Sequence, residues 1–224
     1  MIHLLYMDIR MLAEEALYAK ALTLISEKRK EKILHFQNPL PARLSLGAGV
    51  LLTMALDRYH LKERIEEIRL GKYGKPYLPD AAFHFSLSHS DHYAVCAFGD
   101  LPLGADIQWI KEQVPLRTSR ILSKEEQIYL EKFLDQERVQ RFYQLWARKE
   151  SLMKWDGRGL RLPMQEISFI KEGILADQIV FEGKQLFFQG NNHWIPQYAI
   201  SICSEKPIFL QKIEEITLET LIKY

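Results

Sequence analysis

The sequence has little cysteine, little net charge and no long hydrophobic run, and each shortage removes a class of protein. Two cysteines, Cys96 and Cys203, exclude a disulfide framework and a four-thiolate zinc site and indicate a reducing compartment. The 30 Lys and Arg residues are balanced by 29 Asp and Glu, so a bulk affinity for nucleic acid or anionic membranes is excluded. The longest apolar run, Gly47 to Leu56, is far shorter than the ~20 residues that span a bilayer.

The N-terminal segment has no secretory signal pattern, because Asp8 interrupts it and no small-residue cleavage site follows. We therefore expect a cytoplasmic protein with no membrane or nucleic-acid partner. With 47% apolar and 26% charged residues the composition is that of a globular protein, and 11 Gly with 9 Pro leave no room for a low-complexity region. A length of 224 residues suits one large domain or two small ones.

Hydrophobic periodicity predicts a mixture of helices and strands along the whole chain. A Ser123-Glu126 capping box is expected to open one of the helices. Strands are expected at 2–9, 83–87, 93–98 and 103–110, helices at 11–25, from Ser26, at 43–59, 123–133 and 137–155, and short hairpin strands at 166–202.

Three short segments recur in the same order in the two halves of the chain. Asp8-Ile9-Arg10 resembles 106–108 at an offset of 98, Leu24-Ile25-Ser26 resembles 121–123 at 97, and Tyr93-Ala94-Val95 resembles 198–200 at 105. The nearly constant offset predicts an α+β fold of two similar lobes, 1–102 and 103–224, with a ligand cleft between them. Chance similarity of common tripeptides is the alternative.

The helix expected around 139–154 places a carboxylate among apolar side chains. On a helical wheel Glu150 falls between Tyr143 and Trp146, while Arg141, Gln144 and Arg148 face outward. A carboxylate directed toward a core needs a compensating cation, so Lys149 or a metal ion is expected as its partner. The simpler alternative is a Lys–Glu pair that closes the edge of the core.

The strand 103–110 carries Asp106 and Gln108 on one face, because residues two apart in a strand point to the same side. Two oxygen-bearing side chains form half of a Mg²⁺ site, which commonly adds substrate phosphates, and Glu150 is expected to supply a further oxygen. A strand with one solvated polar face explains the pair equally well.

The remaining polar clusters suggest anion contacts rather than a zinc site. His84, His89 and His92 lack zinc-ligand spacing, whereas Ser88-His89-Ser90 lies at a strand end where side chains and amides converge. Candidate phosphate contacts come from two lysines on a Gly-bounded turn and from an upstream basic run: Lys28, Arg29, Lys30, Lys32, Arg43, Lys72 and Lys75.

Taken together, six motifs in this order resemble the Sfp-type 4′-phosphopantetheinyl transferases over most of the chain, most strongly from 71 to 159. They are EKRKEK at 27–32, ARLSLG at 42–47, YGKP at 73–76, FSLSHS at 85–90, GADIQ at 104–108 and WARKESLMKWDGRGL at 146–160. The resemblance implies two α+β lobes related by a pseudo-twofold, with coenzyme A in the cleft. It implies transfer of the phosphopantetheine arm to a serine of an apo carrier protein, with Mg²⁺ bound and adenosine 3′,5′-bisphosphate released.

The resemblance also assigns residues to the site. Asp106 and Glu150 hold Mg²⁺, Lys149 and Lys154 face the diphosphate, and the other coenzyme contacts are Arg29, Lys32, Arg43, Tyr73, Gly74, Lys75, Ser88 and His89. The carrier serine attacks the β-phosphorus in line, Glu150 accepts its proton directly or through water, and Lys154 assists the leaving phosphate. Gln108 stands where many relatives have a second acid, so either its amide oxygen or a water completes the metal site.

Two other functions compete with this interpretation, and the partner is expected to be acidic. An inactive homologue would hold coenzyme A or a carrier without transfer, and a Mg²⁺-dependent phosphohydrolase would use water as the acceptor. The carrier is expected to present an acidic helix after its modified serine, with Arg158 and Arg161 helping to dock it. Two lobes already form a cleft, so we expect a monomer.

Overall fold

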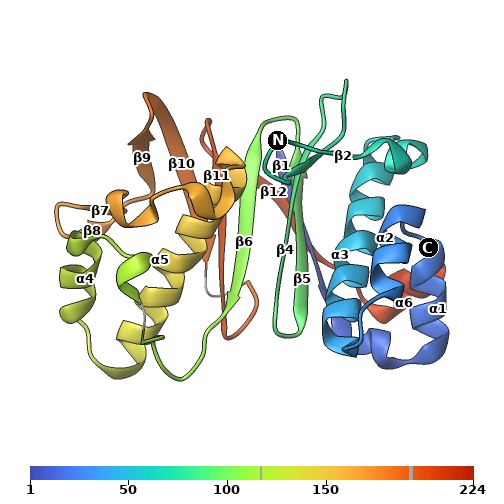
Figure 1. The fold of residues 1–224 in the computed structure, drawn as a ribbon, viewed down its shortest axis with the longest axis horizontal. Coiled ribbons are helices and arrows are strands. Elements are labelled where there is room, and N and C mark those ends of the chain that lie inside the picture. The colour runs from blue at the N-terminus through green and yellow to red at the C-terminus, as the bar shows by residue number, and fades with distance from the viewer. Residues whose placement is uncertain (117, 192–193) are drawn as a thin grey trace. The chain divides into compact units, whose positions relative to one another are not determined.

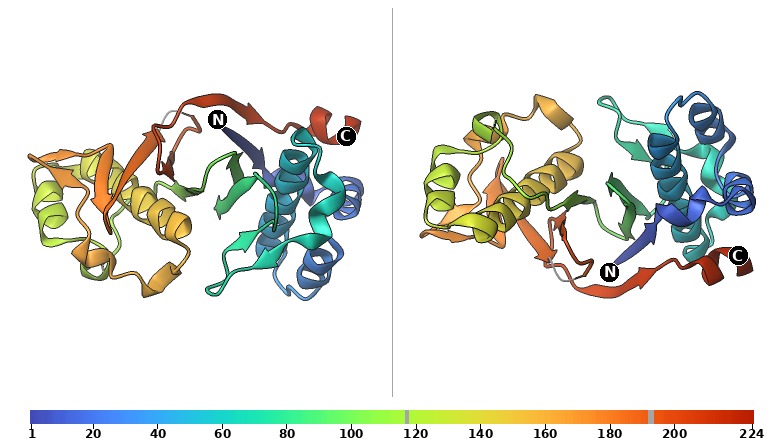
Figure 2. Two further views of the ribbon diagram at one scale, coloured as in Figure 1. Left: turned by 90° about the horizontal axis from the view of Figure 1, so that it is seen from above. Right: turned by 90° about the horizontal axis from the view of Figure 1, so that it is seen from below.

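The computed structural model describes residues 1–116, 118–191 and 194–224, which fold into two compact units. The first unit comprises Met1–Leu101 and Phe209–Tyr224, and the second comprises Pro102–Ile208. The expected division assigned everything after 102 to the second lobe, and the structure corrects this for the last 16 residues. They return to the first unit because β12 (Leu210–Glu215) pairs in parallel with β1 (Ile2–Asp8), as Figure 2 shows for the red C-terminal and blue N-terminal strands.

The first unit is a four-stranded sheet in the order β12-β1-β5-β4, with α1, α2, α3 and α6 on one side (Figure 1). Its buried face packs against the apolar side of α3. Besides β1 and β12, its elements are 3-10 helix η1 (Ile9–Ala13), α1 (Glu15–Thr23), α2 (Glu27–Leu34), α3 (Pro39–Arg58), η2 (Lys62–Glu67), β2 (Arg69–Leu70), β3 (Pro76–Tyr77), β4 (His84–Ser90), β5 (Tyr93–Gly99) and α6 (Leu218–Lys223).

The second unit is a four-stranded sheet in the order β6-β11-β10-β9, against which α5 packs. A second apolar core lies between them. Its elements are β6 (Leu103–Trp109), η3 (Thr118–Arg120), α4 (Lys124–Glu131), α5 (Asp135–Asp156), η4 (Gly159–Arg161), η5 (Met164–Glu166), β7 (Ile170–Lys171), β8 (Ile174–Leu175), β9 (Gln178–Phe181), β10 (Lys184–Asn191) and β11 (Tyr198–Ser204).

Helix α3 begins four residues before its expected start because proline is well tolerated in a first helical turn. Asn38 is the N-cap, and its side chain accepts a hydrogen bond from the backbone N–H of Leu40, while Pro39 occupies the first helical position. The first N–H groups of a helix have no intrahelical acceptor, so proline sacrifices no bond there. Pro39 and Pro41 therefore belong to the helix rather than to the connection before it.

Among the described residues, α3 is also the one helix with the length and apolarity to cross a membrane. Its most apolar window has a mean hydropathy of 1.3, and 78% of that window is buried within the protein. A core helix meets the same criterion, and α3 contributes residues such as Leu46, Val50 and Leu51 to the core of the first unit. Burial in the unit explains the apolar character of this segment.

The two units share one topology. In each, an opening strand is followed by a long helix and then by two antiparallel strands, of which the later one pairs with the opening strand: β1, α3, β4, β5 and β6, α5, β10, β11. The pairing of the strands does not place all the matched tripeptides at equivalent positions in the two units. Tyr93 lies opposite Asp8, whereas Tyr198 lies opposite Trp109, so equating the tyrosines would pair Asp8 with Trp109 and not with Asp106. The repetition is therefore one of topology.

Candidate functional site

Strand β6 and helix α5 approach each other unusually closely at Gly104. A Cβ atom added there would lie 2.1 Å from the backbone oxygen of Ser151 and 2.3 Å from the backbone nitrogen of Trp155. Small buried side chains also join α5 to the neighbouring strand β11, since the Oγ atoms of Ser151 and Ser201 lie 3.0 Å apart. The close approach sets the distance between the polar side chains of β6 and those of α5.

Replacing Gly104 with alanine is expected to separate α5 from β6. The new methyl group meets backbone on both near sides, which cannot move aside as a flexible side chain could, so we expect a loss of about 2–3 kcal/mol of unfolding free energy. Urea unfolding followed by tryptophan fluorescence measures it. Equal stability of Gly104→Ala and wild type would contradict the prediction.

Asp106 is the buried acid of this contact. Only 2% of the residue is exposed, and its carboxylate accepts from two side chains on different elements. The Lys154 ammonium, from α5, lies 2.6 Å from Oδ1, and the Gln108 amide nitrogen, on the same face of β6, lies 2.8 Å from Oδ2. The structure thus brings Asp106, Gln108 and Lys154 together.

Glu150 lies one helical turn before Lys154 and is electrostatically coupled to Asp106. Burial, followed by the negative charge of Asp106, raises the pKa of Glu150 to about 7, against a partial lowering by Lys154. The expected buried carboxylate of α5 is therefore present, but the cation whose charge partly compensates it is Lys154, while Lys149 pairs with Glu126. Two acids that raise each other's energy form a place where added positive charge is favoured.

The oxygen donors present fit a hard divalent cation. Asp106, Glu150 and Gln108 carry carboxylate and amide oxygens, which Mg²⁺ prefers, and three donors leave positions for water and substrate oxygens. In the part of the chain that the structure describes, no group of three or more His, Cys, Asp and Glu side chains could hold a metal. A cation held here would therefore need further oxygens from a ligand.

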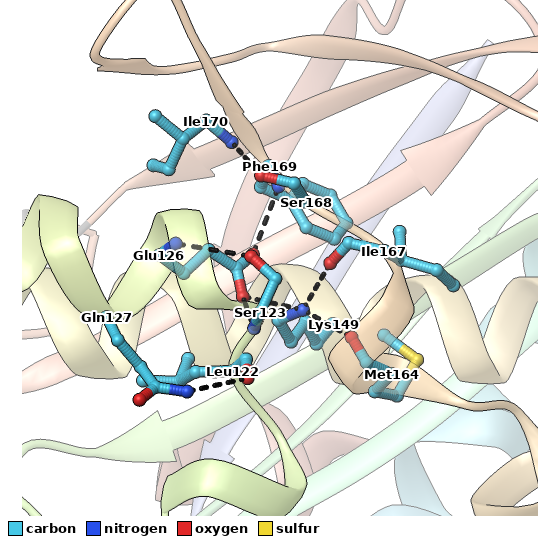
Figure 3. Close-up of polar contacts among 10 residues, drawn as sticks. All are labelled: Leu122, Ser123, Glu126, Gln127, Lys149, Met164, Ile167, Ser168, Phe169 and Ile170. Carbon is cyan, nitrogen blue, oxygen red and sulfur yellow. Dashed lines mark hydrogen bonds and ion pairs between the residues drawn. The ribbon is translucent and has the colours of Figure 1, made fainter.

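Lys149 is the main correction to the predicted site. Its side chain is fully buried, and its ammonium lies 2.8 Å from Oε2 of Glu126, donating as well to the backbone oxygens of Met164 and Ile167 at 2.8 and 2.6 Å (Figure 3). Its ammonium is thus held by Glu126 and two backbone oxygens, and not by Glu150. Burial lowers the pKa of Lys149 more than its carboxylate partner raises it.

Glu126 is the residue that sequence reasoning placed only in a capping box. The box is present: Oε2 accepts from the backbone N–H of Ser123, whose hydroxyl accepts from the N–H of Glu126. Its Oε1 accepts in addition from the N–H of Phe169, 43 residues away. Glu126 and Lys149 therefore join α4, α5 and the 164–169 segment (Figure 3). Nothing local in the sequence signals this long-range pairing.

Two arginines also depart from their expected positions. Arg148 does not face outward but is buried, with its guanidinium 2.7 Å from Oδ1 of Asp177. Arg158 forms ion pairs with Asp156 and Glu182 at 2.6 and 2.7 Å, so it is occupied within the second unit rather than held ready for a partner.

A pocket of about 280 Å³ adjoins Glu150 in the second unit. Its lining combines apolar side chains with two arginines and with Lys149 and Glu150. The full set is Arg120, Ile121, Trp146, Lys149, Glu150, Met153, Leu160, Arg161, Leu162, Pro163, Met164 and Gln165. Glu150 therefore borders a space that a ligand group can enter.

The first unit contains a separate basic pocket of about 190 Å³. Lys28, Arg29 and Lys32 of α2 all line it, so one helix supplies three positive charges to the pocket. The Arg29 guanidinium donates to the backbone oxygen of Ser45 at 3.2 Å, which fixes it against α3. Three cations against one acid, Glu66, leave the lining with a net positive charge, which favours an anionic ligand.

The two strands that flank the predicted turn border the same pocket. Leu70 and Pro76, which pair across β2 and β3, line it, and Tyr73, Gly74 and Lys75 form the turn between those strands. Gly74 has φ of +90°, a conformation that favours glycine. The turn thus depends on Gly74, and it joins two strands that each contribute one residue to the pocket lining.

Three other predicted coenzyme contacts lie elsewhere in the first unit. Arg43 is half-buried in the first turns of α3, Ser88 is buried on β4, and His89 follows it on the exposed side of the strand. None of the three is among the described residues that line the basic pocket. The structure therefore places Arg29 and Lys32 around one space, together with the strands that flank the turn, and places Arg43 on α3 and Ser88 and His89 on β4.

Comparison with known proteins identifies the class to which this fold and site belong. The sequence model of the 4′-phosphopantetheinyl transferase superfamily matches residues 102–203, from just before β6 nearly to the end of β11. A 4′-phosphopantetheinyl transferase of Bacillus subtilis is 30% identical over 220 residues, which cover 97% of both chains. The chain belongs to the 4′-phosphopantetheinyl transferase superfamily.

Two further relatives carry the same name. The 4′-phosphopantetheinyl transferase Sfp of Bacillus subtilis (strain 168) is 29% identical over 222 residues, covering 97% of this chain and 98% of the relative. The 4′-phosphopantetheinyl transferase gsp of Aneurinibacillus migulanus is 30% identical over 141 residues, covering 62% of this chain and 59% of its own. The resemblance inferred from the motifs is thereby confirmed.

Proposed function

We propose that this protein transfers the 4′-phosphopantetheine arm of coenzyme A to a serine of an apo carrier protein, releasing adenosine 3′,5′-bisphosphate. Membership of the superfamily supports the reaction class. The observation that carries the proposal for this chain is the convergence of Asp106, Glu150 and Lys154. Two acids and a lysine are the groups that a cation-assisted transfer to a serine hydroxyl requires.

The two units are proposed to be lobes related by a pseudo-twofold, with coenzyme A in a cleft between them. Support comes from the shared topology of β1, α3, β4, β5 and β6, α5, β10, β11. It also comes from the division of the predicted contacts, since the basic pocket belongs to the first unit and the acids to the second.

Asp106 and Glu150 are proposed to hold Mg²⁺, with Gln108 or a water as a further ligand. A bound Mg²⁺ would neutralise negative charge on the diphosphate. The serine oxygen forms a bond to the β-phosphorus while the bond to the bridging oxygen breaks. Glu150 accepts the serine proton, and the Lys154 ammonium offsets the charge of the leaving bisphosphate. Arg29 and Lys32 are proposed to hold the 3′-phosphate, with the turn at Tyr73, Gly74 and Lys75 and with Arg43, Ser88 and His89 as further contacts.

Gln108→Glu tests whether position 108 belongs to the metal site. The substitution replaces an amide that donates to Asp106 with a carboxylate, adding one negative charge beside two acids. A third acid should tighten Mg²⁺ binding, and we expect the Mg²⁺ concentration for half-maximal transfer to fall about tenfold. Titration of initial rates with Mg²⁺ measures this. An unchanged metal dependence would show that position 108 does not touch the ion.

The carrier is proposed to dock through an acidic helix that follows the modified serine. Arg120 and Arg161 line the pocket beside Glu150 and suit such a partner, whereas Arg158 is already paired. A monomeric, cytoplasmic enzyme remains part of the proposal, as does the absence of a nucleic-acid or membrane partner, on the balanced charge of the sequence.

Incubation with coenzyme A, Mg²⁺ and an apo carrier, followed by mass spectrometry of the carrier, tests the proposed function. Transfer adds the mass of the phosphopantetheine arm to the carrier. Phosphate release without a carrier would instead indicate a phosphohydrolase, and binding of coenzyme A with neither product would indicate an inactive homologue. Apo carriers from fatty acid, polyketide and nonribosomal peptide synthesis should be tried in parallel, because the site does not select among them.

A further inference from the structure

Lys154 contacts one of the two carboxylate oxygens through which Asp106 could bind a metal ion. Its ammonium lies 2.6 Å from Oδ1, while Oδ2 accepts from Gln108 on the same strand. The Lys154 side chain is 28% exposed and that of Asp106 only 2%, so Lys154 is the member of the pair that solvent reaches. We propose that Lys154 is an internal competitor of the divalent cation: it neutralises the acid pair until the diphosphate of coenzyme A draws it away. This inference rests on the proposed function.

Competition follows from the charges and from the shared oxygen. The negative charge of Asp106 acts on Glu150, and the positive charge of Lys154 opposes it while Lys154 is also ion-paired with Asp106. An ammonium at hydrogen-bond distance from Oδ1 repels a cation that approaches the same atom. Gln108 does not compete, because its amide nitrogen contacts Oδ2 and carries no net charge.

The consequence is coupling between coenzyme and metal. While Lys154 is paired with Asp106, a divalent cation must displace a bound ammonium, which weakens its affinity for the protein alone. A diphosphate offers Lys154 another anionic partner, and its release from Asp106 leaves Oδ1 to the metal. Each ligand should therefore raise the affinity of the other by the same factor. Asp106 and Glu150 would then bind the divalent cation mainly when coenzyme A is present.

Mn²⁺ binding by electron paramagnetic resonance tests the competition without measuring activity. The full chain is stripped of metal and titrated at pH 8, with and without coenzyme A, as wild type, Lys154→Met and Lys154→Arg. Removing the ammonium should tighten Mn²⁺ binding about tenfold or more without coenzyme A. Lys154→Arg should remain within a few-fold of wild type. Coenzyme A should tighten Mn²⁺ binding to wild type markedly, and to Lys154→Met much less.

The outcomes separate this inference from the proposed function. One outcome is that wild type binds Mn²⁺ when coenzyme A is present, but that without coenzyme A Lys154→Met binds Mn²⁺ no more tightly than wild type does. This outcome overturns the competition and leaves the proposed metal site intact. If none of the proteins binds Mn²⁺ with coenzyme A, both proposals fail. Lys184→Met, an exposed lysine paired with Glu205, is the control and should leave Mn²⁺ binding unchanged. Lys154→Gln, which keeps a donor for Asp106, replaces the Met variant should that protein not fold.

Discussion

Lys149→Met should lower the free energy of unfolding of the second unit by about 3–5 kcal/mol, because it leaves the Glu126 carboxylate buried without its cation. The methionine side chain has a similar length, so the packing loss is small and the charge loss dominates. Glu126 would keep its backbone donors at Ser123 and Phe169, which limit the loss without removing it.

Urea unfolding followed by tryptophan fluorescence measures this effect in the appropriate unit. All four tryptophans, at 109, 146, 155 and 194, lie within 102–208, so the signal reports on the second unit. Lys171→Met, an exposed lysine of β7, is the matched control and should change stability by less than about 0.5 kcal/mol. The double variant Glu126→Leu with Lys149→Met should recover part of the loss, since replacing both partners of a buried ion pair is often nearly neutral. Equal stability of Lys149→Met and wild type would refute the structural role.

This buried pair marks the limit of what the sequence could predict. Asp106 of β6 could be predicted from strand alternation, and Glu150 from its place in the apolar arc of α5, because both patterns are local. The partner of Lys149 could not be predicted, since Glu126 lies 23 positions earlier and its capping-box role already accounted for its presence. Wheel position also failed for Arg148, because the 176–177 segment covers a face of α5 that periodicity leaves open.

The fold was predictable to a similar depth. Strands and helices were located because their apolar patterns are strong, and the error at the start of α3 came from treating proline as a breaker where it is well tolerated. The return of 209–224 to the first unit could not be predicted, because the parallel pairing of β12 with β1 joins opposite ends of the chain. The site depends less on these ends than on the β6–α5 contact, which a single close approach at Gly104 sets.

Glu150→Gln should abolish transfer while making the metal-stripped protein more stable above neutral pH. Loss of the proposed base, which is also a metal ligand, should lower the transfer rate at least about 100-fold. The stability gain follows from the pKa of Glu150, which is about 7 in the folded protein and lies above its ordinary value. Between those two values the folded state binds more protons than the unfolded state, so this group makes stability fall as pH rises. Glutamine cannot ionise and escapes that penalty.

The size of the stability gain and its pH range distinguish a buried acid with a raised pKa from an exposed acid with an ordinary one. In the presence of EDTA we expect Glu150→Gln to exceed wild type by about 1–3 kcal/mol at pH 8, a range that allows for the partial exposure of the side chain. Near pH 4.5 the difference should largely disappear, because Glu150 is then protonated in the folded protein as well. Glu137→Gln, an exposed acid on the same helix, controls for the loss of a surface charge and should show no such pH dependence. If Glu150→Gln proved no more stable than wild type at pH 8, Glu150 would not be an acid held at a cost for its function.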